Sequence, residues 1–144
     1  MHTVIVNKTL MRYCVTVMLS LGCIVSCNTS NENTLKSILD KIGGNYTVIS
    51  DGSDSTAPFE KKDLAWHLQA KDNHIVVPDY MVLSDHSDLL FAVDCISSIL
   101  NIPKEHIDSN QVYKSTFGDK DTMQSLYFLT NSSSNNVYVY LFRN

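Results

Sequence analysis

The sequence predicts an α+β fold, an antiparallel β-sheet of about five to six strands with two helices packed on it. Two segments carry apolar residues at helical spacing, and several others alternate between apolar and polar residues as strands do. Helical and strand segments do not alternate regularly along the chain, which favours an antiparallel sheet. The 144 residues suffice for one such domain, and a composition of 44% hydrophobic and 18% charged residues excludes wholesale disorder.

The first predicted helix begins after Thr34, a suitable N-cap residue. Its apolar residues recur at i, i+3, i+4 and i+7 and form one stripe, which comprises Leu35, Ile38, Leu39 and Ile42. Gly43 and Gly44 then end the helix, because glycine readily adopts the backbone conformation found just past a helix C-terminus.

The second predicted helix runs from Ser87 to about Ile102, with Ser84 or Asp85 as its cap. A broad apolar arc should face the core, and it comprises Leu89, Ala92, Val93, Ile96, Ile99 and Leu100. Cys95 lies at the edge of this arc, which favours a buried, unreactive thiol over a reactive one.

Strand-like patterns occupy much of the remaining chain. The segments are Tyr46–Ile49, Asp63–Lys71, His74–Val77, Tyr80–Leu83, Gln111–Phe117, Thr122–Thr130 and Val137–Arg143. Within Asp63–Lys71 one side is apolar and the other is mostly polar, so we expect a half-buried strand. Residues 131–136 are Asn and Ser only, which predicts a turn and therefore a hairpin between the last two strands.

The last of these strands is apolar or amphipathic on both faces. Its residues alternate between two sets, Val137, Val139 and Leu141 on one side and Tyr138, Tyr140 and Phe142 on the other. We expect helices and neighbouring strands to cover both faces. In the alternative, the tyrosine-bearing face is exposed and Tyr138 and Tyr140 are candidate protein-contact residues, because tyrosine is enriched at interfaces.

Residues 1–26 have the pattern of a secretory signal peptide, which is removed from the mature protein. Arg12 supplies the positive charge, together with Lys8 if translation starts at Met1 rather than Met11. Residues 14–26 contain no charge. This run is too short for a permanent transmembrane helix, which needs about 20 residues.

The end of the uncharged run, Ile24-Val25-Ser26-Cys27, resembles the lipobox of bacterial lipoproteins. The resemblance implies cleavage before Cys27 and attachment of diacylglycerol to its thiol. It also implies a lipid-anchored protein of the bacterial cell envelope, at the outer membrane or on a periplasmic face. Ser20-Leu21-Gly22-Cys23 matches less well, because Ser20 stands where the motif has an aliphatic residue. The alternatives are an ordinary signal that another peptidase cuts and a buried N-terminal helix.

These assignments divide the chain into a signal peptide at 1–26, a lipidated cysteine with a polar tether at 27–33, and one α+β domain at 34–144. Cleavage removes Lys8 and Arg12 and leaves nine basic and fifteen acidic residues, a net charge of −6. This acidic balance excludes a nucleic-acid binder that relies on a basic surface. With Cys27 acylated, Cys95 has no disulfide partner, so stability must come from the core.

The chain contains no sequence signature of a common catalytic site. Cys-x-x-Cys, His-Glu-x-x-His, Gly-x-Ser-x-Gly and a phosphate-binding glycine loop are all absent. The densest set of metal-ligating residue types lies between His74 and Asp88 and includes Asp79, Asp85 and His86. Because Asp85 and Asp88 also suit the start of a helix, we assign neither a metal nor any other cofactor.

The sequence therefore favours a non-enzymatic envelope lipoprotein, held to the membrane by lipid on Cys27, whose small acidic domain binds another macromolecule. Immunity proteins and inhibitors that neutralise toxins or lytic enzymes share this size, anchor and charge. A net charge of −6 suits a basic protein partner. Two alternatives stay open: a small metal-dependent hydrolase that uses the His74–Asp88 region, and an accessory subunit of an envelope complex.

Overall fold

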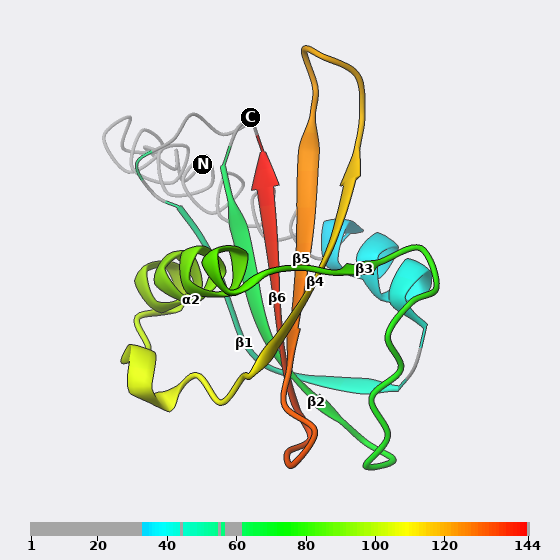
Figure 1. Cartoon of the computed structure of the whole chain (residues 1–144), viewed down its shortest axis with the longest axis vertical. Coiled ribbons are helices and arrows are strands. Elements are labelled where there is room, and N and C mark those ends of the chain that lie inside the picture. The colour runs from blue at the N-terminus through cyan, green and yellow to red at the C-terminus, as the bar shows by residue number, and fades with distance from the viewer. Residues whose placement is uncertain (1–32, 44, 55, 57–61, 144) are drawn as a thin grey trace, which may run out of the picture. The chain divides into compact units, whose positions relative to one another are not determined.

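The structure is a computed structural model that describes residues 33–43, 45–54, 56 and 62–143 (Figure 1). The chain divides into two compact units, Met1–Lys41 and Ile42–Asn144, and each unit is described by itself. The predicted signal peptide 1–26, the predicted tether up to residue 32 and the lipidation residue Cys27 lie outside the described residues.

Residues 33–42 are helical. Ile38 and Ile42 are buried, which agrees with the predicted apolar stripe. The helix already includes Thr34, so the prediction that Thr34 is its N-cap is wrong. Gly43 has a φ of 68° and follows the last helical residue, as a residue in the left-handed conformation commonly does.

A six-stranded antiparallel sheet, counted over the described residues, forms the framework of the second unit, and its strand order is β1-β2-β6-β5-β4-β3. The strands are β1 (Tyr46–Ser53), β2 (Leu64–Ala70), β3 (Val82–Leu83), β4 (Gln111–Phe117), β5 (Gln124–Thr130) and β6 (Asn136–Arg143). The predicted hairpin between the last two strands is confirmed, and β6 also pairs with β2 at the centre of the sheet. The α+β fold class, with its antiparallel sheet and two helices, is likewise confirmed.

The structure corrects two of the predicted strands. No strand forms at His74–Val77. The chain turns at Pro78, whose carbonyl accepts the backbone N–H of Met81 at 3.0 Å, and only the two residues of β3 then pair with β4. β1 instead runs four residues past the predicted end at Ile49, with a β-bulge between Val48 and Ser50. Its later residues are polar because β1 is an edge strand with a partner on one side only.

Helix α2 (His86–Leu100) begins after Asp85 and ends at Asn101. The Asp85 carboxylate accepts the backbone N–H of Asp88 at 3.0 Å, which makes Asp85 the N-cap. Ser84, the other candidate, is not the cap, and its hydroxyl instead donates to the carboxylate of Asp88. Asn101 closes the helix in the left-handed conformation, with a φ of 53°. The predicted helix is confirmed to within two residues at either end.

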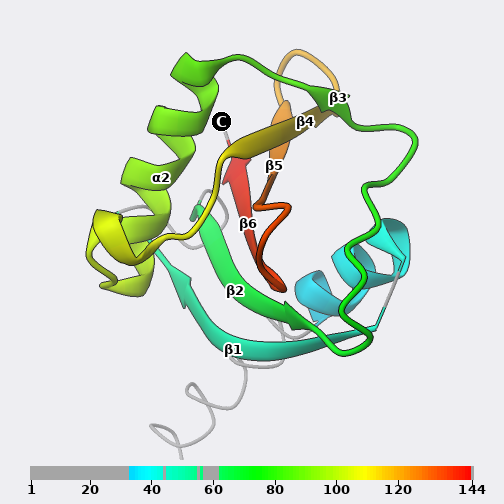
Figure 2. The ribbon, with the colours of Figure 1, turned by 60° about the horizontal axis from the view of Figure 1, so that its bottom comes forward.

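Helix α2 packs against one face of the sheet (Figure 2). The buried side chains of this layer are Ala65, Ala92, Ile96, Ile107, Val112, Tyr127, Leu129, Tyr138 and Tyr140. β1 approaches the helix at Gly52, where an added Cβ would lie 2.8 Å from the carbonyl oxygen of Ile99. This close approach requires glycine, because even an alanine methyl would overlap the helix backbone.

The opposite face of the central strands is buried as well. Its side chains are at most 2% exposed, and they include Leu64, Trp66, Leu68, Leu126, Phe128, Val137, Val139 and Leu141. Coverage of both faces of the last strand is thereby confirmed. The predicted half-buried strand is confirmed in β2, whose apolar side is buried while Gln69 on the other side is exposed and His67 is half-buried. Ala65 alone on that second side is fully buried, because it lies in the layer beneath α2.

Candidate interaction surface

Tyr138 and Tyr140 point from β6 toward helix α2, and their exposed fractions are 2% and 0%. The ring of Tyr138 stacks on His67 with 4.5 Å between ring centroids, and its hydroxyl donates to the carbonyl of His106 at 3.3 Å. Burial raises the pKa of both tyrosines. The alternative that made them contact residues on an exposed face is therefore wrong, because α2 covers that face.

Tyr140 belongs to a polar cluster inside the domain. Its hydroxyl donates to Oδ2 of Asp63 at 2.6 Å, while Oδ1 of Asp63 accepts the backbone N–H of Arg143 at 2.9 Å. The half-buried thiol of Cys95 hydrogen-bonds the Tyr140 side chain, and burial raises the pKa of that thiol. A raised pKa keeps the thiol protonated at neutral pH, which accords with the predicted unreactive cysteine. These contacts connect α2, β6 and the start of β2, so the cluster serves the fold.

Of the candidate metal ligands between His74 and Asp88, two have local roles at the start of α2, and the other three, His74, Asp79 and His86, are exposed. Asp85 caps α2, and hydrogen bonds from Ser87 and from the Asp88 backbone lower its pKa. Asp88 accepts a hydrogen bond from Ser84 and forms an ion pair of 3.3 Å with Lys114 of β4. Throughout the described part of the chain, no three His, Cys, Asp or Glu side chains lie together in a way that could hold a metal ion.

Lys114 also contacts the aromatic layer beneath α2. Its ammonium lies 5.0 Å from the centre of the Tyr127 ring. Burial by itself would lower the pKa of Lys114, but hydrogen bonds to Tyr127 and Asp88 outweigh burial and raise it. Lys114 therefore stays charged, and its contacts with Asp88 and Tyr127 join the N-terminal turn of α2 to the sheet.

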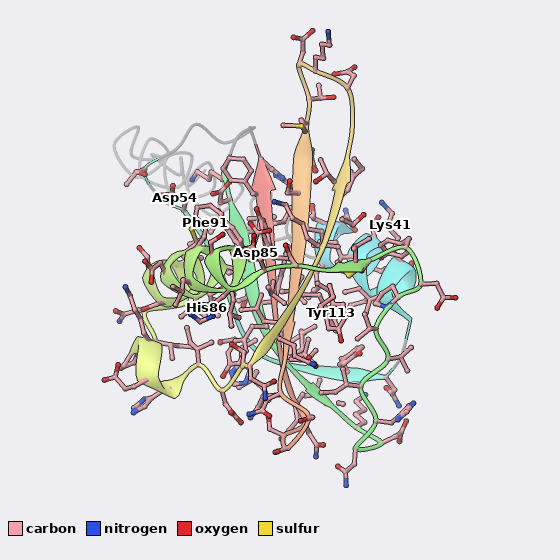
Figure 3. The ribbon with its side chains drawn as sticks, in the orientation of Figure 1. Lys41, Asp54, Asp85, His86, Phe91 and Tyr113 are labelled. Carbon is pink, nitrogen blue, oxygen red and sulfur yellow. The ribbon has the colours of Figure 1, made fainter. Side chains whose placement is uncertain are left out.

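Exposed apolar side chains occur along β3 and the first half of α2. Val82 and Leu83 are 71% and 58% exposed, and Leu90 and Phe91 on α2 are 53% and 42% exposed. Figure 3 labels Phe91 and His86 of α2, and Asp85 immediately before the helix. Although Phe91 is partly exposed, its ring also packs against three aromatic rings of the sheet, with 5.8–6.3 Å between ring centroids. These rings belong to Tyr127, Tyr140 and Phe142.

Acidic residues accompany these apolar side chains. Residues 72–103 include five aspartates and neither lysine nor arginine. Four of the aspartates are exposed, and they are Asp72, Asp79, Asp85 and Asp94. We call the exposed residues Asp79, Val82, Leu83, Asp85, Leu90, Phe91 and Asp94 of β3, α2 and their flanks the acidic–apolar surface. Lys104, one residue beyond this segment, forms an ion pair of 2.7 Å with Asp94. Exposed large apolar side chains with polar and charged residues around them are features of a protein-binding surface.

The acidic–apolar surface was not predicted from the sequence, although one signal was present. The absence of basic residues from 72–103 can be read directly from the sequence. The exposure of Leu90 and Phe91 cannot, because both lie near the apolar arc of α2 and both resemble core residues. Only the direction in which α2 packs shows that these side chains lie outside the core.

Comparison of the chain with protein-family models, with curated proteins and with solved structures finds no match. Among the described residues, no helix has both the length and the apolar character needed to cross a bilayer.

Proposed function

We propose that this chain is a lipid-anchored protein of the bacterial envelope whose small acidic domain binds another protein, as an immunity or inhibitor protein that neutralises a toxin or a lytic enzyme. The observation that carries the proposal is the acidic–apolar surface on β3 and α2. The anchor is the lipid expected on Cys27, through the resemblance of residues 24–27 to a lipobox.

The apolar members of the surface supply the binding energy in this proposal. Leu83 and Leu90 are more than half exposed, so a partner that covers them removes apolar area from water. Phe91 is held by core aromatics on one side and is exposed on the other. Such a ring loses little conformational entropy on binding, which is a property of interface hot spots.

The acidic members select the partner. Asp79 is exposed and carries a negative charge in a segment without basic residues. Asp94 is exposed as well, and its carboxylate forms an ion pair of 2.7 Å with Lys104, just beyond that segment. Charges at the rim of an interface act mainly on the rate of association and on its salt dependence. A toxin or lytic enzyme with a basic surface has the complementary charge, and its association with this domain should slow as salt rises.

Site-specific cross-linking tests the surface. A photoreactive residue at position 90 should form an adduct with one protein from the envelope or secreted fractions of the source cells. The matched control is position 123, since Met123 is also an exposed apolar residue, 42% exposed, but lies beyond β4. Adducts of equal yield from both positions, or from neither, would contradict the proposed surface.

Binding kinetics then separate the two roles. Leu90→Ala and Phe91→Ala should raise the dissociation rate of the captured partner at least tenfold in total. The double variant Asp79→Asn and Asp94→Asn should slow association at low salt and have little effect at high salt.

If the captured protein is a toxin or lytic enzyme, the wild-type domain should inhibit it at equimolar amounts. Turnover of a substrate by the purified chain, lost on replacement of one histidine, would favour the hydrolase instead.

The anchor requires its own test. Wild-type cells fed a labelled fatty acid should give a labelled protein in the membrane fraction, and Cys27→Ser should abolish the label and release the domain. Cys23→Ser is the control and should leave labelling unchanged. Label that persists in Cys27→Ser and disappears in Cys23→Ser would place the cleavage site at the earlier cysteine.

The exposed apolar side chains of the same surface also favour a second candidate function, an accessory subunit of an envelope complex. In that case the cross-linked protein would be a permanent membrane component present at equal copy number. It would co-purify with the chain without addition of any toxin.

A further inference from the structure

The two edges of the sheet differ in how far they are protected from further strand pairing. β3 has only two residues and is flanked by the charged residues Asp79 and Asp85. β1 has eight residues and forms the opposite edge. Short and charged edge strands are a common defence against pairing with another chain. β3 has that defence, and the first half of β1 does not.

The hydrogen bonds of β1 define which backbone groups face outward. The N–H of Lys71 donates to the carbonyl of Asn45 at 2.9 Å, and the register then pairs Thr47 with Gln69. Along an antiparallel strand, the backbone N–H and C=O groups of successive residues point alternately toward and away from one neighbouring strand. The N–H and C=O of Thr47 therefore point toward β2, and those of Tyr46 and Val48 point away from it. The opposite residue agrees, because the N–H of Ala70 donates away from β1, to Asn135.

The side chains of this run suit a further strand. Residues 45–50 carry no charge and no proline, and three consecutive residues, Thr47, Val48 and Ile49, are β-branched and exposed. β-Branched residues are favoured in strands, and charges and prolines normally guard an exposed edge. The bulge at Ile49 ends the regular part of the edge, so a new strand can pair without interruption only as far as Val48.

We propose that β1 pairs with β1 of a second copy of this chain, antiparallel, about a two-fold axis at Thr47. Tyr46 of each copy then exchanges backbone hydrogen bonds with Val48 of the other, and the two Thr47 residues lie opposite each other. A two-fold axis brings identical residues together, so a charged strand would repel its own copy. The uncharged run satisfies this condition, and the sheets of the two copies become one. This inference does not depend on the proposed function.

Cysteine cross-linking of the full chain tests the axis. Residues opposite each other in a non-hydrogen-bonded antiparallel pair have Cα atoms about 4.5 Å apart, within disulfide reach. Thr47→Cys should therefore form a covalent dimer under mild oxidation, at several times the yield of wild type, whose native cysteines set the background. Val82→Cys is the matched control, because Val82 is a β-branched residue on the other edge and is 71% exposed. Equal yields from the two variants would overturn the proposal.

Sedimentation equilibrium provides the second measurement. The wild-type full chain should reach twice the 16.2 kDa mass of one copy, and Val82→Lys should do the same. Thr47→Lys should reduce the mass to that of one copy, because two like charges would face each other at the axis. A monomeric wild type, or a dimer unaffected by Thr47→Lys, would overturn the proposal. A dimer lost equally in both lysine variants would place the interface elsewhere and would also overturn it.

Discussion

The hydroxyl of Tyr140 in β6 donates a hydrogen bond of 2.6 Å to Asp63, the residue immediately before β2. The second oxygen of Asp63 accepts the backbone N–H of Arg143, so one carboxylate connects the start of β2 to the end of β6 at two points. Tyr140 is fully buried, and its hydroxyl therefore depends on this partner. A hydrogen bond between a buried hydroxyl and a charged acceptor is stronger than one between neutral groups.

Tyr140→Phe should lower the free energy of unfolding by about 1–3 kcal/mol, because the acceptor on Asp63 loses its donor. Denaturant unfolding followed by tryptophan fluorescence measures this change. Tyr80→Phe is the control and should have little effect, since Tyr80 is 46% exposed. In a double-mutant cycle, Tyr140→Phe and Asp63→Asn should be non-additive. Additive losses would show that the two side chains do not act on each other.

Alkaline pH should destabilise the domain through Tyr140. Burial and the hydrogen bond to Asp63 raise the pKa of Tyr140 in the folded state. The unfolded chain therefore loses this proton first, near pH 10, so the stabilisation is complete below about pH 10 and decreases as the pH rises above it. Thermal melts between pH 8 and 12 should show this decrease for wild type and a shallower one for Tyr140→Phe. Some dependence should persist, because burial also raises the pKa of Tyr138.

Gly52→Ala should destabilise the domain by about 1–3 kcal/mol, because the new methyl group would meet the backbone of α2. The distance from an added Cβ to the carbonyl oxygen of Ile99 is 2.8 Å, and a backbone group cannot move aside as a flexible side chain can. Thermal unfolding measures the effect. Asp51→Ala, at an exposed position of the same strand, should change stability by less than about 0.5 kcal/mol. A Gly52→Ala variant as stable as wild type would show that α2 does not pack this closely on β1.

Ile96→Asp should prevent cooperative folding or cost several kcal/mol, because Ile96 is fully buried between α2 and the sheet and an unpaired charge there has no compensating partner. Leu90→Asp is the matched control on the same helix, where the side chain is 53% exposed, and it should fold normally. Circular dichroism and melting temperature distinguish the two variants. A soluble Ile96→Asp variant that melts like wild type would place this face of the helix in water.

Several features follow from local sequence alone. The second helix, its cap at one of two adjacent residues and the hairpin of the last two strands were predicted because each depends on residues close together in the chain. The period of apolar residues defines a helix or a strand, and a capping carboxylate bonds an amide three residues away. The failures at His74–Val77 and Thr34 are local as well, and they show that apolar content or a capping residue type does not by itself form an element.

The candidate surfaces depended on tertiary structure. The alternating pattern of Tyr138 and Tyr140 is the same in a covered strand and in an exposed one, so the sequence did not determine their exposure. They are core residues because α2 packs over them. Leu90 and Phe91 are exposed for the same reason, since α2 turns another side to the sheet. The status of β1 as an edge follows from β6 pairing with β2 across about 70 residues of sequence. Local patterns determine which segments can form strands and helices, whereas long-range packing determines which of their faces are left in water.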